Sequence, residues 1–176
     1  MDANSLIELV DLLDAAGIDH WLDGGWGVDA VLGEQARPHK DVDLVVRTTD
    51  LERLGTTLAT KGYAVASRAS PANVVYRDAV GREIDIHAIE FDTEGNGRYR
   101  MASGETWIYP APGFAGRGSV GARQVRCLTA EVQILCHATG YTPTQKDIDD
   151  MERLRARFGV ALPPHLSRRS QSKPPT

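Results

Sequence analysis

Several features that mark particular classes of protein are scarce in this chain of 176 residues. Its two cysteines, Cys127 and Cys136, lack the CxxC spacing of a zinc or redox site, so we expect buried free thiols. No apolar run approaches the roughly 18 residues that cross a bilayer, and the first residues do not resemble a signal peptide. We therefore expect a cytoplasmic protein without a membrane partner. The net charge of −4 argues against a nucleic acid partner, which would need a basic face.

What is present is the composition of a soluble globular protein, with 41% hydrophobic and 25% charged residues. The length fits one domain of ordinary size. We predict a single domain over residues 1–162, with a core at about 18–128 and a helical C-terminal part at about 129–158. Residues 163–176 are polar and rich in proline, which predicts a disordered tail.

The spacing of apolar residues predicts helices that alternate with short strands. Helices are expected at residues 4–16, 26–32, 51–61, from 129 onward and at 144–157, and strands at 18–22, 42–46, 63–68, 73–77, 83–89 and 124–128. Residues 91–122 are rich in glycine and proline and are expected to form a long functional loop. Together these elements predict an α/β protein of the α+β kind, built around a mixed sheet.

Three aspartates lie among apolar residues on predicted strands. Asp41 and Asp43 point to the same face of one strand, where two like charges repel unless a cation lies between them. Mg²⁺ prefers oxygen ligands from a few carboxylates, phosphates and waters. If Asp85 lies on the neighbouring strand, it completes a two-metal cluster or accepts the proton of an attacking hydroxyl. An isolated Asp-x-Asp is common on loops, but the apolar frame favours a metal site of Asp41, Asp43 and Asp85.

A glycine pair separates a predicted strand from the helix that begins at Trp26. A turn without Cβ atoms at a helix N-terminus lets backbone N–H groups approach phosphate oxygens. Gly24 and Gly25 are therefore candidates for nucleotide binding. A glycine pair alone usually marks only a turn, so the functional interpretation depends on its combination with the aspartates.

Cationic residues near these motifs could neutralise the charge of a triphosphate. Arg37, His39 and Lys40 directly precede the first aspartate, although solvated surface charge is an equal alternative. Lys146, on the last long helix, could reach the triphosphate as a point charge. An i,i+4 pair with Asp150 explains Lys146 more simply.

The acceptor side of the site is harder to assign. His87 shares a strand face with Asp85, so it is a candidate for substrate contact, with a buried structural histidine as the alternative. Four aromatic residues could line an apolar pocket, with core packing as the alternative. They are Trp21, Trp26, Tyr76 and Trp107. Of these candidates we assign His87, Tyr76 and Trp107 to substrate binding.

Two further features have a supporting role in this interpretation. Asp29 is expected to orient the glycine turn from the helix that follows it. The segment Gly116–Gly121 matches G-x-G-x-x-G, but no strand leads into it and no helix follows, so a dinucleotide motif is not predicted. We expect this segment to form a flexible loop over the acceptor pocket.

The glycine pair followed by the three aspartates resembles the signature of the DNA polymerase β-like nucleotidyltransferase superfamily. A narrower resemblance, over about residues 18–155, is to the small lincosamide nucleotidyltransferases, with aminoglycoside 2″-nucleotidyltransferases as more distant relatives. It depends on four segments of this sequence. They are WLDGGWGVD at 21–29, RPHKDVD at 37–43, IDIH at 84–87 and RCLTAEVQ at 126–133.

This resemblance implies a transfer of AMP from ATP, or another nucleoside triphosphate, to a hydroxyl of a small-molecule antibiotic. By the same resemblance Asp41 and Asp43 hold Mg²⁺, expected as two ions, and Asp85 is the third carboxylate. The expected step is in-line attack on the α-phosphorus, with Asp85 accepting the proton and pyrophosphate leaving toward the glycine turn. The gap between glycines and aspartates is longer than in the wider superfamily, and Pro38 and Lys40 stand at positions where variation is expected.

Alternatives of other kinds remain at this stage. The acceptor could be an aminoglycoside instead of a lincosamide. The chain could also be an antitoxin-type module that binds a nucleotide or transfers AMP to a protein. A homodimer is an open alternative to a monomer, because the chain offers little surface to enclose a large acceptor.

Overall fold

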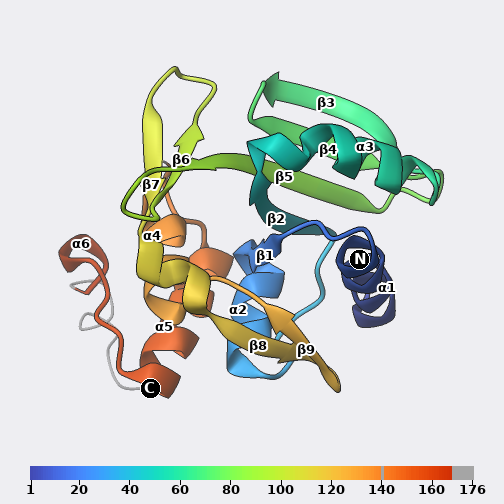
Figure 1. Cartoon of the computed structure of the whole chain (residues 1–176). Coiled ribbons are helices and arrows are strands. Elements are labelled where there is room, and N and C mark those ends of the chain that lie inside the picture. Colours follow the sequence, from blue (N-terminus) through green and yellow to red (C-terminus); the bar gives the residue numbers. More distant parts are fainter. Residues whose placement is uncertain (140, 168–176) are drawn as a thin grey trace.

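The computed structural model describes residues 1–139 and 141–167 of the chain. In this part, seven strands form a mixed sheet with helices on both faces, and a two-stranded hairpin packs beside it (Figure 1). The sheet contains β1 (His20–Asp23), β2 (Asp41–Arg47), β3 (Ala64–Ser70), β4 (Asn73–Arg77), β5 (Glu83–Phe91), β6 (Gly97–Arg100) and β7 (Thr106–Tyr109), and the hairpin contains β8 (Arg117–Val120) and β9 (Arg123–Arg126). The helices are α1 (Ala3–Ala15), α2 (Gly24–Leu32), α3 (Leu51–Ala59), α4 (Ala130–Ala138), α5 (Gln145–Phe158) and α6 (Pro164–Ser167), with 3-10 turns η1 (Thr48–Asp50) and η2 (Ala111–Ala115). The predicted α+β fold around a mixed sheet is confirmed.

The order of the strands places the predicted motifs side by side. The main path runs β1-β2-β5-β4-β3, and the β6–β7 hairpin extends from the end of β5. β2 and β5 are parallel, and their register pairs Asp43 with Asp85. β1 is antiparallel to β2, and its register pairs Asp23 with Asp43. Residues 23, 43 and 85 therefore form a row across three adjacent strands.

The two faces of the sheet have different partners because side chains alternate along each strand. Val42 and Leu44 on β2, with Ile84 and Ile86 on β5, point into the main core, which α1 and α3 cover. The intervening residues of these strands point to the opposite face. There Val45 packs in a second cluster with residues of α4 and the aromatic segment around η2. Asp41 and Asp43 of β2 and Asp85 of β5 lie on this second face.

Helix α2 begins directly at the glycine pair and carries the site-forming turn. Its N-cap is Asp23, whose Oδ1 accepts a hydrogen bond from the backbone N–H of Gly24 at 2.7 Å. It ends at Gly33, which has the left-handed φ of 78° that is common at a helix C-terminus. The other end of the chain packs onto α2, since Val28 shares a buried cluster with Ile134 of α4 and Leu154 of α5.

The region 91–122 differs most from the prediction. It was expected to be a long loop, but it contains β6, β7, η2 and β8. The segment Gly116–Gly121 belongs to the β8–β9 hairpin, which packs against α2, so the predicted flexible loop over the acceptor pocket is wrong. A Cβ at Gly118 would lie 2.1 Å from the carbonyl oxygen of Ala30, so the glycine serves close packing of the hairpin on α2.

The predicted tail also begins too early. Residues 164–167 form α6, and Leu166 is buried in the cluster with α4 and α5. The rest of that prediction, residues 168–176, lies outside the described residues. Cys127 and Cys136 are free thiols, Cys127 buried and Cys136 half-buried, which confirms the expectation of unpaired cysteines. Among the helices described, none has the length and apolar character required to span a membrane.

Candidate active site

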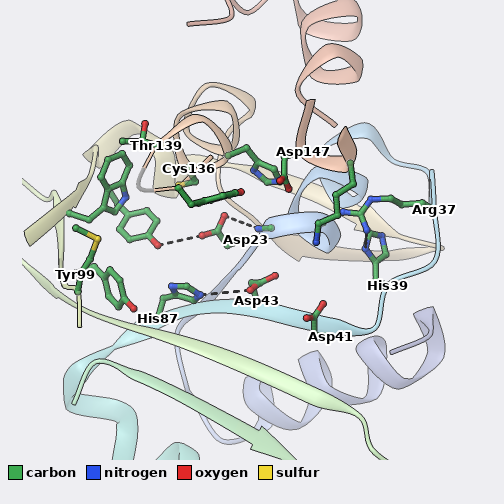
Figure 2. Close-up of a pocket in the computed structure, with 18 residues that line it drawn as sticks. Asp23, Arg37, His39, Asp41, Asp43, His87, Tyr99, Cys136, Thr139 and Asp147 are labelled. Atoms are coloured by element: carbon green, nitrogen blue, oxygen red, sulfur yellow. Dashed lines mark hydrogen bonds and ion pairs between the residues drawn. The ribbon is translucent and has the colours of Figure 1, made fainter. Parts of the chain in front are cut away.

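A cavity of about 360 Å³ opens where the acidic face of β2 and β5 meets the start of α2 (Figure 2). Residues of the β6–β7 hairpin line one end of the cavity, and residues of α4 and of the start of α5 also line it. Its lining residues come from all of these elements. They are Asp23, Gly24, Gly25, Arg37, His39, Asp41, Asp43, His87, Tyr99, Met101, Trp107, Tyr109, Cys136, His137, Thr139, Tyr141, Lys146 and Asp147.

Asp23 is a carboxylate of the site that the sequence analysis did not assign. It is buried, lines the cavity and accepts a hydrogen bond from the hydroxyl of Tyr109 at 3.4 Å, in addition to the one from Gly24. Burial and the nearby charge of Asp43 raise the pKa of Asp23, whereas His87 opposes this shift. The available signal was its position on a buried strand immediately before the glycine pair.

His87 lies between two of the predicted carboxylates. Its Nε2 is 3.7 Å from Oδ1 of Asp43 and 3.9 Å from Oδ1 of Asp85. Burial disfavours the charged imidazole, but Asp43, Asp85 and Asp23 outweigh it and raise the pKa of His87 to about 9. A positive imidazolium therefore offsets the repulsion between the acidic side chains.

Asp85 is held by its neighbours in the sheet. Its Oδ1 accepts a hydrogen bond from Nδ2 of Asn73 at 2.6 Å. Burial raises the pKa of Asp85, His87 lowers it, and Asp43 raises it further. Asp85 belongs to the acidic cluster, although it is not among the residues that line the cavity.

The donor atoms fit a divalent cation. One ligand atom each from Asp43, Asp85 and His87 can be chosen so that all lie within 4.8 Å of one another. The two carboxylates are oxygen donors of the kind that Mg²⁺ prefers, and they bring like charges together on one face. Asp41 lies two residues earlier on β2, is exposed and lines the same cavity, but it is outside this compact group. The structure thus brings Asp43 and Asp85 together and places Asp41 at the rim of the site.

The glycine pair is required by two close approaches. Gly24 has a φ of +58°, and a Cβ there would lie 2.2 Å from Oδ2 of Asp43. A Cβ at Gly25 would lie 2.5 Å from both Nη2 of Arg37 and Nδ1 of His39. Any side chain at either position would displace groups that line the cavity. The turn therefore sits between the acidic cluster and a cationic group.

The predicted cations have different surroundings. Arg37 lines the cavity and is fixed by Asp150, with Nη2 donating to Oδ2 at 2.7 Å. Lys146 also lines the cavity, and the simpler explanation of a Lys146–Asp150 pair is wrong, because Asp150 is paired with Arg37 and Arg153. Lys40 is exposed and does not line the cavity, so its assignment to nucleotide binding is corrected to surface charge.

Aromatic side chains form the opposite end of the cavity. Tyr99, Trp107 and Tyr109 come from the β6–β7 hairpin, and Tyr141 follows α4. The ring centroids of Trp107 and Tyr109 are 6.4 Å apart in an edge-on arrangement. Of these residues only Trp107 was predicted from the sequence. Tyr99 and Tyr109 were missed because their short strands were interpreted as a loop, and Tyr141 because it lies in the connection between α4 and α5.

Three other aromatic candidates do not line the cavity. Tyr76 pairs with Ile84 across β4 and β5 and shares its face, so Tyr76 is buried in the main core and its substrate role is corrected. Trp21 is buried among aromatic rings and donates to the carbonyl of Phe114. Trp26 is buried against His39, with ring centroids 4.6 Å apart.

A sequence model of the family described as aminoglycoside-2″-adenylyltransferase matches residues 5–154. A lincosamide resistance protein of Staphylococcus haemolyticus is 27% identical over 151 residues, which cover 86% of this chain and 92% of that protein.

Two solved structures are also similar to this chain. The crystal structure of the lincosamide antibiotic adenylyltransferase LnuA, bound to lincomycin, is similar with a TM-score of 0.75 and 27% identity, covering 87% of this chain and 96% of that chain. The crystal structure of ANT(2″)-Ia in complex with adenylyl-2″-tobramycin has a TM-score of 0.70 at 18% identity and covers 89% of both chains. The second likeness supports the fold alone.

Proposed function

The chain belongs to the aminoglycoside-2″-adenylyltransferase family and is a nucleotidyltransferase, and we propose that it transfers AMP from ATP to a hydroxyl of a lincosamide antibiotic. The observation that carries this proposal is the arrangement of the cavity. An acidic cluster lies between a glycine turn with a cation on one side and a set of aromatic side chains on the other. The first side suits a triphosphate, and the second suits an acceptor with an apolar part.

The acceptor end favours a lincosamide over an aminoglycoside, which carries several amines. Four aromatic side chains line that end, those of Tyr99, Trp107, Tyr109 and Tyr141. Such rings suit an acceptor with an apolar part better than one that carries several amines. The family model that matches the chain is nevertheless that of an aminoglycoside enzyme, so an aminoglycoside is the second candidate.

Asp43 and Asp85, with Asp41 at the rim, would hold Mg²⁺, and bound Mg²⁺ supplies neutralisation of the charge on the phosphates. In the proposed step the acceptor oxygen forms a bond to the α-phosphorus, and the bond from that phosphorus to the pyrophosphate oxygen breaks. Asp85 takes the proton of the acceptor hydroxyl, with Asn73 orienting its carboxylate. The backbone N–H groups at Gly24 and Gly25 and the side chain of Arg37 receive the leaving pyrophosphate.

The direct test is to incubate the purified protein with ATP, Mg²⁺ and lincomycin and to look by mass spectrometry for lincomycin with one AMP added. A parallel reaction contains tobramycin in place of lincomycin. Asp43→Asn should abolish the product, whereas Asp149→Asn, the same substitution at an exposed position of α5, should leave it unchanged.

Each outcome decides between the candidates. Adenylylated lincomycin that is lost in Asp43→Asn supports the proposal. Adenylylated tobramycin alone replaces the lincosamide with an aminoglycoside. No product with either drug, but AMP bound to an added protein, would instead identify the antitoxin-type alternative.

A further inference from the structure

A chain of buried polar contacts runs behind the glycine turn and ends at the cavity. Asp29 on α2 contacts His39, with 2.5 Å between Oδ2 and Nε2. His39 contacts Arg37, with 3.1 Å between Nδ1 and Nη1. Arg37 then binds Asp150 on α5 through Nε and Nη2, at 3.1 and 2.7 Å to Oδ2. These contacts join α2, the segment before β2, and α5.

The hydrogen bonds in this series of contacts can each be assigned a donor and an acceptor. A guanidinium has only donors, so Nη1 of Arg37 donates to Nδ1 of His39, which must be an acceptor. The proton of a neutral imidazole then lies on Nε2, and this group donates to Asp29. His39 therefore transmits the fixed position of Asp29 to the guanidinium of Arg37.

Burying charged and polar side chains costs free energy of folding unless they are paired with one another. The side chains of Asp150, Asp29 and His39 are only 1%, 2% and 3% exposed, whereas that of Arg37 is 24% exposed and lines the cavity. Of these four side chains, only that of Arg37 is appreciably exposed.

The location of Arg37 is also unusual for a cation. Its Nη2 lies against Gly25 in the first turn of α2, where the positive end of the helix dipole disfavours a positive charge. An anion placed at this turn would interact favourably with both the helix terminus and the guanidinium.

We propose that His39 and Asp150 are positioning residues, which hold Arg37 as a preformed donor for the polyphosphate of the nucleotide at the glycine turn. This inference rests on the proposed function only in requiring that ATP binds in the cavity. It does not depend on which acceptor is used. Arg37 contacts the polyphosphate, and Asp150 and His39 act through Arg37.

The test compares ATP binding by calorimetry, without acceptor, in matched variants. Asp150→Asn removes the charge that fixes Arg37, and Asp149→Asn makes the same change one residue away at an exposed position. We expect Asp150→Asn to weaken ATP binding about tenfold, the scale on which loss of a supporting partner weakens a metal site. Asp149→Asn should bind ATP as the wild type does.

A double-mutant cycle separates positioning from a general structural defect. Arg37→Met should also weaken ATP binding, and Asp150→Asn should then cause no further loss in the Arg37→Met protein. His39→Gln keeps one donor and one acceptor and should retain most of the affinity, whereas His39→Leu should lose it. In assays with acceptor, Asp150→Asn should raise KM for ATP and change kcat little.

Each contrary outcome overturns a distinct statement. If the wild type binds ATP and Asp150→Asn binds it equally, the positioning role is wrong while the proposed function stands. If the losses in Asp150→Asn and Arg37→Met simply add, Asp150 does not act through Arg37. If the wild type binds no ATP, both this inference and the proposed function fail.

Discussion

The two ends of the cavity are built in different ways (Figure 2). At the glycine-turn end, defined by Gly24, Gly25, Arg37 and His39, most polar atoms have fixed partners at hydrogen-bond distance and the backbone allows no side chain. At the aromatic end, defined by Tyr99, Trp107, Tyr109 and Tyr141, the rings of Tyr99 and Trp107 each meet that of Tyr109 edge-on, with centroids 6.5 and 6.4 Å apart, and few hydrogen bonds restrain them. Every reaction of this kind uses the same set of phosphate groups, whereas acceptors vary in shape. Rigid geometry at one end and adaptable surface at the other follow from that difference.

The largest effect should come from disturbing the glycine-turn end. Gly24→Ala places a Cβ 2.2 Å from Oδ2 of Asp43, and the residue also has a positive φ. We expect kcat to fall at least about a hundredfold, the scale on which loss of one preorganised electrostatic group slows an enzyme. Steady-state assays with ATP and the acceptor measure this loss.

The backbone contribution to that loss has a matched control. Gly121 has a φ of +56°, close to that of Gly24, but a Cβ there meets no atom within 4 Å. Gly121→Ala should lower the melting temperature by backbone strain alone and leave kcat unchanged. Equal loss of activity in both variants would show that strain, not contact with Asp43, is responsible.

A smaller effect is expected at the aromatic end. Trp107→Ala should raise KM for the acceptor about tenfold, as truncation of an aromatic anchor does in other interfaces, and should leave KM for ATP unchanged. Ile108 is the next residue on β7, is exposed and points away from the cavity, so Ile108→Ala is the control. A change in KM for ATP in Trp107→Ala would show that the two ends do not act separately.

The same contrast explains what the sequence could and could not predict. Asp41, Asp43 and Asp85 lie on strands with strong apolar patterns, so their strand assignment, and the common face of Asp41 and Asp43, followed from alternation alone. The paired β1 register that adds Asp23 to the row required knowledge of which strands are neighbours. Sequence spacing does not specify that neighbourhood.

The aromatic end was largely hidden because its strands are only four residues long. Glycine and proline around them favour loops locally, and pairing with β5 overrides that preference. Asp150 was read as a local partner of Lys146, since an i,i+4 spacing is visible in sequence, whereas its contact with Arg37, 113 residues away, is not. Both predictions therefore failed because contacts between residues distant in the sequence override the local sequence preference.

The protonation of His87, which lies in the acidic cluster between the two ends, should be detectable by NMR. In the metal-free protein, NMR titration should show His87 protonated up to a pKa of about 9, whereas burial lowers the pKa of His20, which serves as an internal reference. Because the folded pKa of His87 exceeds the unfolded value of about 6.5, its contribution to stability is complete below that value and is lost as pH rises through about 9. Urea unfolding of wild type and His87→Gln should therefore differ most at low pH and converge above about pH 9. A His87 resonance that titrates with that of His20 would contradict the ion-pair geometry.

The smallest expected effect is that of removing one tyrosine hydroxyl, compared between the two faces of the sheet. Tyr76→Phe and Tyr109→Phe remove the same hydroxyl, but Tyr76 is buried in the main core and Tyr109 donates to Asp23 inside the cavity. We expect Tyr76→Phe to keep kcat and both KM values within about twofold, as for substitutions away from a functional contact. Tyr109→Phe leaves Asp23 with one donor fewer beside Asp43, so KM for the acceptor should rise while the melting temperature changes little. If Tyr76→Phe instead raised KM for the acceptor, the acceptor would have to reach the face that α1 and α3 cover, and the division of the cavity into two ends would be wrong.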